Sequence, residues 1–395
     1  MATVGVSASR PSTTRRRTQL AGAAATRFHR LGYHQVSLAD VASDVGVTAP
    51  AVYRHFRGKQ DLLAGAIGSG LTLVEEALAQ TDDAPLDVLV TTLAELVLDR
   101  PDLWTLLQRE VRFLDPELRS EVRQQLGRVI AGLLRRIRAR RPDLAADDAL
   151  LLVTAATAAL ATPSVPGSTP RALVGHELAR SAMAILELPW PVTSPGPTEH
   201  EAGSATDPDD VESRRTALLD SAIDLFFHRG YAAVSLDDIG ASVGIAGPSI
   251  YHHFPTKADL LAAAFSRATD RLIEDHDNRA GTAPQRSLAE LVGVYTDFCL
   301  RNRRLVGVYV SEANNLPQAA QRRVKAVLRD RTADWTAALG QTYPAVDQRV
   351  TRLRVLTALT VIDDLARIGP FHARPRIAVE VRAVAMAILI ASGPG

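Results

Sequence analysis

The segment from Arg16 to Leu63 reads RRTQLAGAAATRFHRLGYHQVSLADVASDVGVTAPAVYRHFRGKQDLL, and the segment from Arg214 to Leu261 reads RRTALLDSAIDLFFHRGYAAVSLDDIGASVGIAGPSIYHHFPTKADLL. The two segments align without a gap at a constant offset of 198 residues, and about half of the aligned positions are identical. Self-similarity at a fixed offset is the sequence signature of a duplicated unit. We therefore predict a tandem duplication of a unit of roughly 190 residues.

The repeated segment is predicted to begin with an amphipathic helix. In the first copy, Leu20, Ala24 and Phe28 recur every four residues and define the inward face of a helix that starts after the arginines. Gly32 follows and suits the left-handed conformation that ends a helix. The corresponding residues of the second copy are Leu218, Ala222, Phe226 and Gly230.

Capping residues delimit a second and a third helix. Ser37 stands three residues before Asp40, which is typical of a helix N-cap, and Gly46 ends this helix after about two turns. The third helix is predicted over residues 49–56, with Pro50 in its first turn, where the missing N–H costs nothing. The second copy has Ser235, Asp238, Gly244 and Pro248 at these positions, and its third helix is predicted over residues 247–254. Two short helices joined by a glycine turn form a helix-turn-helix, a DNA-binding motif.

The third helix is the candidate reading helix, because the second helix of such a motif lies in the major groove. Positions that differ between the copies are predicted to select bases, and shared positions to contact phosphates or to pack. The differing positions are Thr48, Ala49, Ala51 and Arg54 in the first copy and Ala246, Gly247, Ser249 and His252 in the second. The shared positions are Tyr53 and Tyr251, His55 and His253, and Phe56 and Phe254, with Lys59 and Lys257 suited to phosphate contacts. Further candidate DNA contacts are Arg16, Arg17, Ser37 and Ser235.

These motifs carry a family resemblance. The run from Gly32 to Leu63, with SLADVA, VGV and VYRHFRGKQDLL, resembles the N-terminal domain of the TetR family of bacterial regulators, and the run from Gly230 to Leu261 resembles a second copy. The resemblance implies an all-α protein in which each three-helix DNA-binding domain precedes a helical bundle that binds an inducer and dimerises through its last two helices. It also implies repression of target genes. The second copy departs from the first at Ala246 and Pro255, which puts its DNA contacts in doubt.

Charge is distributed unequally between the two copies. The chain as a whole has a formal net charge of +1, but residues 1–65 carry nine basic and three acidic side chains, whereas residues 212–262 carry four and six. Phosphate neutralisation supplies most of the nonspecific affinity for DNA. An alternative is therefore that only the first helix-turn-helix binds DNA and that the second unit is a sensory or protein-interaction module.

The domain organisation follows from the repeat and from the segment between its copies. Residues 189–210 contain five prolines and no lysine or arginine, a composition typical of a linker. The predicted domains are a flexible N-terminal arm (1–14), a first helix-turn-helix domain (15–62), a first helical regulatory domain (63–189), a linker (190–210), a second helix-turn-helix domain (211–260) and a second regulatory domain (261–395).

The last two helices of each regulatory domain are the most apolar, and by the family's plan they should pair as a four-helix bundle. They are predicted over residues 147–161 and 171–188 in the first half and 346–368 and 377–390 in the second. Their pairing within one chain would give a pseudo-dimer, and pairing between chains would give a homodimer. Polar residues among apolar ones are candidates for effector pockets, or else core hydrogen-bonding groups: Trp104, Gln108 and Glu110 in the first half, and Tyr295, Tyr309, Glu312 and Trp335 in the second.

Other functional classes find little support in the sequence. It contains no glycine-rich phosphate loop, no G-x-S-x-G and no H-E-x-x-H, so we expect neither an enzyme nor a cofactor or metal site. The single cysteine, Cys299, excludes an internal disulfide and is expected to be a small buried residue. The N-terminus lacks the apolar core of a signal peptide, and later apolar segments are interrupted, which predicts a cytosolic protein with no membrane partner. The expected partners are an operator in double-stranded DNA and a small-molecule effector.

Overall fold

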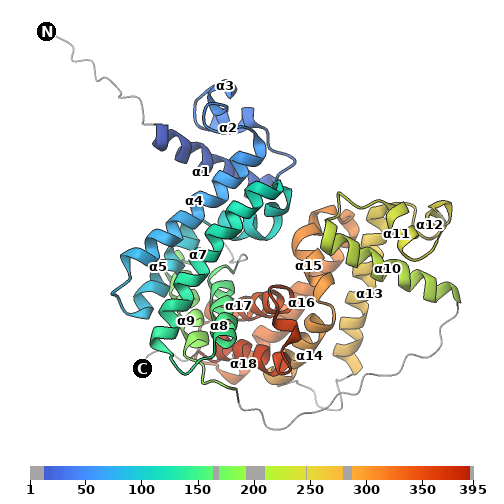
Figure 1. Cartoon of the computed structure of the whole chain (residues 1–395). Helices are drawn as coiled ribbons and strands as arrows, with labels where there is room; N and C mark the ends of the chain where they lie inside the picture. Colours follow the sequence, from blue (N-terminus) through green and yellow to red (C-terminus); the bar gives the residue numbers. More distant parts are fainter. Residues whose placement is uncertain (1–12, 163–168, 193–209, 246, 279–286, 392–395) are drawn as a thin grey trace. The chain divides into compact units, whose positions relative to one another are not determined.

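The computed structural model describes residues 13–162, 169–192, 210–245, 247–278 and 287–391, and every regular element within these ranges is helical (Figure 1). The chain divides into two compact units, Met1–Arg136 and Ile137–Gly395. The all-α prediction is confirmed. Most of the predicted N-terminal arm and of the predicted linker lies outside the described residues.

The first unit contains the first helix-turn-helix and the start of the first regulatory domain. Its elements are α1 (Thr13–Leu31), α2 (Leu38–Asp44), α3 (Ala49–Val52), α4 (Lys59–Gln80), α5 (Leu86–Asp99), α6 (Asp102–Thr105), the single π-helical turn η1 (Leu106–Glu110), the 3-10 turn η2 (Val111–Phe113) and α7 (Pro116–Arg140), whose last turn belongs to the second unit. Helices α1 and α4 pack together, and the predicted inward residues Leu20, Ala24 and Phe28 are fully buried between them and their neighbours.

The second unit holds the rest of the chain. Its elements are α8 (Ala146–Leu160), α9 (Arg171–Leu186), α10 (Asp210–Arg229), α11 (Leu236–Ser242), α12 (Gly247–His253), α13 (Lys257–Asn278), α14 (Leu288–Arg301), α15 (Arg303–Glu312), the 3-10 turns η3 (Ala313–Asn315) and η4 (Phe371–Ala373), α16 (Gln318–Thr342), α17 (Gln348–Arg367) and α18 (Ile377–Leu389). Here α10 to α13 repeat the order of α1 to α4.

The last helices of the two halves pack against one another inside the second unit. Helices α8 and α9 come from the first half. Helix α8 packs against α17, and α9 packs against both α17 and α18 (Figure 1). Small buried residues such as Ala155, Ala158 and Ala159 line α8 and allow its neighbours to approach closely. The predicted bundle therefore forms within one chain in this structure, with bounds that differ from the predicted ones by one or two residues.

Three helix bounds of the helix-turn-helix domains differ clearly from the sequence-based prediction. Helices α1 and α10 begin at Thr13 and Asp210, before the paired arginines rather than after them, because arginine is a good helix former and does not stop a helix. Helix α3 ends at Val52 rather than at residue 56. The N–H of His55 donates to the carbonyl of Val52 at 2.9 Å, so the chain tightens into a turn there.

One described helix, α4, has the length and composition that would allow it to cross a membrane. Half of that apolar window is buried inside the protein, as in the core helix of a soluble domain. Its apolar face is thus used in packing, with Leu62, Leu63, Ala66 and Ile67 fully buried.

Candidate nucleic-acid interface

The first helix of each helix-turn-helix begins in the same way in both copies. Ser37 caps α2: its Oγ accepts the N–H of Asp40 at 3.1 Å, and the Asp40 carboxylate accepts the N–H of Ser37 at 2.9 Å. The Ser37 hydroxyl also donates to this carboxylate at 2.6 Å, and the hydrogen bonds from the hydroxyl and the N–H of Ser37 lower the pKa of Asp40. Ser235 and Asp238 form the same capping box on α11. The predicted caps are confirmed, and they engage the serine hydroxyls that were also candidate DNA contacts.

Glycines in the left-handed region form the turns on either side of α2 and of α11. Gly32 and Gly46 have φ angles of +79° and +68°, and Gly230 and Gly244 have +82° and +72°. An L side chain at these positions would be strained. The direction in which α3 and α12 leave the turn is thus fixed by the backbone, as a reading helix requires.

The first reading helix presents an exposed polar surface. Thr48 is the N-cap residue of α3, and its exposed side chain makes no capping hydrogen bond. Tyr53 has an exposed fraction of 59%, and Arg54 is also exposed, whereas Ala49 and Ala51 are half-buried. The predicted base-selecting positions that carry functional groups are therefore free to meet a ligand, and their role as DNA contacts stays a prediction.

The second reading helix presents fewer charges. Tyr251 has an exposed fraction of 50%, Ser249 and His252 are exposed, and His253 is half-buried. Gly247 is the first residue of α12, and Ala246 lies outside the described residues. Where the first copy offers Arg54, the second offers His252, so the two exposed surfaces differ in their basic side chains.

The candidate phosphate lysines also hold the motif together. The Nζ of Lys257 donates to the carbonyls of Tyr231 and Val234 at 2.6 and 2.7 Å and lies 4.3 Å from the centroid of the Tyr231 ring. Lys59 lies 4.4 Å from the centroid of the Tyr33 ring in the first copy and donates to a different carbonyl of the same loop, that of His34, at 3.3 Å. Burial lowers the pKa of both ammonium groups. The presence of lysine at this position in both copies therefore has a structural explanation in addition to the predicted phosphate contact.

An arginine from the first helix supports the end of the reading helix in each copy. The guanidinium of Arg17 lies 4.3 Å from the centroid of the Phe56 ring and donates to the carbonyl of His55. Arg215 takes the same place over Phe254, at 4.5 Å. Arg17, a candidate DNA contact, is thus tied to the motif, while Arg16 is half-buried on the same helix.

A buried glutamate links each regulatory domain to its helix-turn-helix. Glu110 is 7% exposed, and its carboxylate accepts the backbone N–H of Tyr33 at 3.1 Å. Glu312 is 1% exposed and accepts the N–H of Tyr231 at the same distance. Burial raises the pKa of Glu110, although the hydrogen bond from Tyr33 opposes the shift. The sequence shows the recurrence of these glutamates but not their partners, which lie 77 and 81 residues away.

Two neighbouring cavities lie within the second regulatory domain. The larger, of about 200 Å³, is lined by Tyr295 and Trp335, and the smaller, of about 60 Å³, by Tyr295 and Tyr309. The side chains of Leu272 and Arg331 line both. Three predicted pocket residues are thus brought together, whereas Trp104 and Gln108 line neither of these cavities.

A polar cluster stands at the wall of the smaller cavity. The hydroxyl of Tyr295 donates to Asp363 at 2.5 Å, the Cys299 thiol lies 3.4 Å from the same oxygen, and the Arg331 guanidinium lies 3.8 Å from the centroid of the Tyr295 ring. Burial raises the pKa of Asp363, and it also raises that of the thiol. Cys299 is fully buried, as expected for the single cysteine. Among the described residues no group of three potential metal ligands occurs.

Comparison with known proteins agrees with these features. The model of the bacterial regulatory proteins of the tetR family matches residues 20–66 and again residues 218–264, which span the two helix-turn-helix motifs. The transcriptional activator FasR of Mycolicibacterium smegmatis is 33% identical over 89 residues, which are 22% of this chain and 41% of that protein. The repressor KstR2 of Rhodococcus jostii is 30% identical over 114 residues, 28% of this chain and 56% of that protein. The chain thus spans about half the length of these relatives, which are named regulators rather than enzymes.

Two solved structures each match somewhat less than half of the chain. The match to a TetR-family regulator from Bordetella parapertussis covers 45% of this chain and 94% of that regulator's chain, at 19% identity and a TM-score of 0.40. KstR2 of Mycobacterium tuberculosis covers 44% and 93%, at 21% identity and a TM-score of 0.38. Scores of this size support no conclusion about the whole chain. The two family matches, on motifs with the same caps, turns and supporting side chains, show that the chain carries the DNA-binding domain of the tetR family of bacterial regulatory proteins twice.

Proposed function

We propose that the chain is a cytosolic DNA-binding transcriptional regulator, acting as a repressor, whose two reading helices recognise an operator with dissimilar half-sites. The observation that carries the proposal is the contrast between a shared scaffold and different exposed residues. Both copies have the same capping box and glycine turns, and in each a lysine donates to the loop before the helix-turn-helix. In the second copy, however, Thr48 is replaced by alanine and the exposed Arg54 by the exposed His252. Operator symmetry mirrors protein symmetry. We therefore expect two different reading helices to recognise two different half-sites.

The pairing of α8 and α9 with α17 and α18 supports a pseudo-dimer as the binding unit. One chain then supplies both reading helices. An alternative is that only the first motif binds DNA, since Arg54 has no charged counterpart in the second and the second segment carries net negative charge. In that case two chains would meet on a palindrome.

Selection of binding sites from random duplex DNA tests these alternatives. The intact protein would be compared with Tyr53→Ala and Tyr251→Ala variants, and the mass of each complex measured. Both tyrosines are exposed, so the substitutions should leave the fold intact. A non-palindromic site bound by one chain and lost in both variants supports the proposal. A palindrome bound by two chains and unaffected by Tyr251→Ala contradicts it and favours the alternative.

We also propose that the two cavities of the second regulatory domain receive a small, mainly apolar effector. Helix α13 contributes Leu272 to the cavities and begins at Lys257, which holds the loop of the second helix-turn-helix. Movement of α13 on binding would therefore reach the reading helix directly. The buried Nε of Arg331 has no hydrogen-bond partner within the described ranges and offers a donor to a polar group of the effector.

A fluorescent apolar anion, anilinonaphthalene sulfonate, is a suitable probe for this site. We expect one molecule to bind per chain and to weaken DNA binding. Val327→Phe, which fills the cavities, should abolish binding of the probe, and Tyr309→Phe, which keeps their shape, should not. Equal binding by the Val327→Phe variant would place the probe elsewhere and contradict this assignment.

A further inference from the structure

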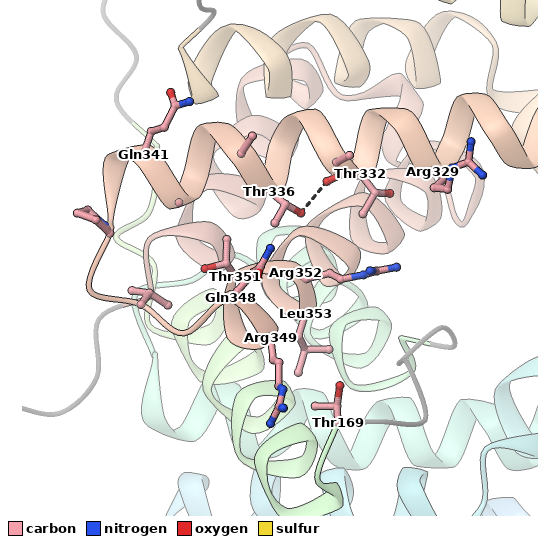
Figure 2. Close-up of a pocket in the computed structure, with 15 residues that line it drawn as sticks. Thr169, Arg329, Thr332, Thr336, Gln341, Gln348, Arg349, Thr351, Arg352 and Leu353 are labelled. Carbon is pink, nitrogen blue, oxygen red and sulfur yellow. Dashed lines mark hydrogen bonds between the residues drawn. The ribbon is translucent and has the colours of Figure 1, made fainter.

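A separate groove of about 780 Å³ lies between α16 and α17 in the second unit (Figure 2). This volume is within the range typical of small-molecule sites. Figure 2 shows polar side chains on both helices around it. Its polar lining consists of Arg329, Thr332, Thr336 and Gln341 on α16, Gln348, Arg349, Thr351 and Arg352 on α17, and Thr169 just before α9. None of these residues lines the two apolar cavities.

The groove is positively charged. Its lining includes three arginines and no aspartate or glutamate. Arg329 lies 3.3 Å from the exposed carboxylate of its neighbour Asp330, a pair that contributes little at a surface. Arg349 and Arg352 are exposed and form no ion pair among the described residues. The nearest acidic residue in the sequence, Asp347, accepts the N–H of Arg349 at 2.7 Å and caps α17.

The threonine hydroxyls in the groove are arranged as acceptors. Thr332 donates to the carbonyl of Leu328 at 2.8 Å, and Thr336 donates to the carbonyl of Thr332 at 2.6 Å. Thr351 donates to the carbonyl of Asp347 at 3.1 Å but is only 1% exposed, so Thr332 and Thr336 are the threonines open to a ligand. A hydroxyl has one proton and two lone pairs, so these two groups can only accept further hydrogen bonds. A complementary ligand would therefore carry donors, such as hydroxyl groups, as well as negative charge.

The first half lacks this chemistry. Helices α7 and α16 are both 25 residues long and align at an offset of 202 residues, as do the starts of α8 and α17. At this offset Thr332, Thr336, Arg349 and Arg352 correspond to Ile130, Leu134, Asp147 and Leu150. The second half thus has threonines where the first has Ile130 and Leu134, and arginines where the first has Leu150 and Asp147. The groove is thus a particular property of the second half rather than of the shared fold.

We propose that this groove binds a small hydroxylated anion of the class of sugar phosphates. The arginines take the phosphate, because a guanidinium matches its geometry with paired N–H donors. The threonine oxygens take the sugar hydroxyls. The site is distinct from the apolar cavities and carries a second signal to the same half of the chain.

Calorimetric titration of the full-length protein at low salt, without DNA, tests the proposal. The probes are ribose 5-phosphate, ribose and inorganic phosphate. We expect ribose 5-phosphate to bind at least tenfold more tightly than either part alone. Arg349→Asp and Arg352→Leu, which introduce the residues of the first half, should each weaken binding at least tenfold. Thr336→Val should lower the affinity for ribose 5-phosphate toward that for phosphate.

Arg322→Leu is the matched control, because it removes an exposed arginine of the same helix that does not line the groove. Unchanged binding by this variant, with thermal unfolding of all variants like that of the parent, supports a specific site. Equal loss in the control would show a general charge effect and overturn the proposal. Absence of binding by all three probes, or equal affinity for phosphate and ribose 5-phosphate, would also overturn it. None of these results depends on DNA binding, so the proposed function is tested separately.

Discussion

Individual side chains of the reading helix divide into those that face solvent and those that support the motif. Thr48 and Arg54 are exposed, whereas Lys59 donates to a loop carbonyl and Arg17 lies over Phe56. The sequence placed all four at the interface, because charge and position in a motif are visible in it. It does not show which charged groups are engaged by the protein itself, since those contacts join residues 25 to 38 positions apart.

Substitution at Thr48 should change the preferred DNA sequence rather than the affinity for DNA in general. We expect Thr48→Ala to cost about 1–3 kcal/mol at one base position, the usual value of a lost base contact. Tyr53→Phe should weaken binding to all sequences alike. Site selection from a randomised library measures both effects. An unchanged preference in the Thr48 variant would remove this residue from the set of base contacts.

Glu110 should stabilise the link between the first regulatory domain and its helix-turn-helix. Glu110→Ala leaves the N–H of Tyr33 without its acceptor, and we expect a loss of about 1–3 kcal/mol in the free energy of unfolding. Glu110→Gln keeps an acceptor oxygen and should lose less. Denaturant unfolding at neutral pH measures the difference. Equal losses in the two variants would show that the hydrogen bond is not the stabilising feature.

The same glutamate predicts a pH dependence. Because burial raises its pKa in the folded protein, the folded state binds the proton more tightly than the unfolded state, whose pKa is near the ordinary value of 4.5. The contribution of Glu110 to stability is therefore full below that value and decreases as the pH rises through the folded pKa. Glu110→Gln should remove this decrease. Stability curves that fall with pH to the same extent in both proteins would contradict the assignment.

At the scale of helices, the sequence predicts best what is set locally. The caps at Ser37 and Ser235 and the turns at Gly46 and Gly244 were predictable because each depends on residues within one turn. The last two helices of each half were predictable because continuous apolar segments must be buried. The early end of α3 was missed because no strong stop residue directly follows Val52. The true start of α1 was missed because the prediction places the arginines before the helix, although arginine is a good helix former. The groove between α16 and α17 needs the packing of two helices and was not predicted.

A buried ion pair joins helices from the two halves. Arg354 on α17 donates to Glu177 on α9 at 3.1 Å, with side-chain exposures of 7% and 3%, and Arg180 donates to the same carboxylate at 3.0 Å. Removing one partner of a buried pair leaves a poorly compensated charge. We expect Arg354→Leu to lower the free energy of unfolding by about 3 kcal/mol. The double variant Glu177→Leu, Arg354→Leu should regain most of the loss, and failure to do so would show that packing rather than charge is at fault.

At the scale of the whole molecule, this pair favours the union of unlike halves. Helices α9 and α18 align on the shared sequence AMAIL, which places Glu380 opposite Glu177 in the alignment, while Arg354 corresponds to Leu152. In a dimer of two first halves with the same packing, Glu177 would therefore face leucine in place of Arg354 and keep only Arg180 as its partner. Glu380 has its own partner in Arg374, at 2.7 Å. The charges thus distinguish the mixed pairing from a pairing of identical halves.

Cleavage of the chain within residues 193–209 should leave the protein as one complex. We expect a folded protein with an engineered protease site there to keep both fragments in a 1:1 ratio after cutting, with the mass of a single chain. Size-exclusion chromatography with light scattering measures this. Exchange of the fragments into separate homodimers, or a mass of two chains before cleavage at all concentrations, would contradict the pseudo-dimer.

A bundle closed within one chain also changes how the protein responds to its own abundance. Two separate subunits assemble in proportion to the square of their concentration, so a dimeric regulator loses its active form steeply when it is scarce. Tethered helices meet at a fixed effective concentration that does not depend on expression. Occupancy of the operator should therefore follow gene dosage in simple proportion. Because each half is encoded separately, a single mutation in the gene alters one reading helix and leaves the other unchanged.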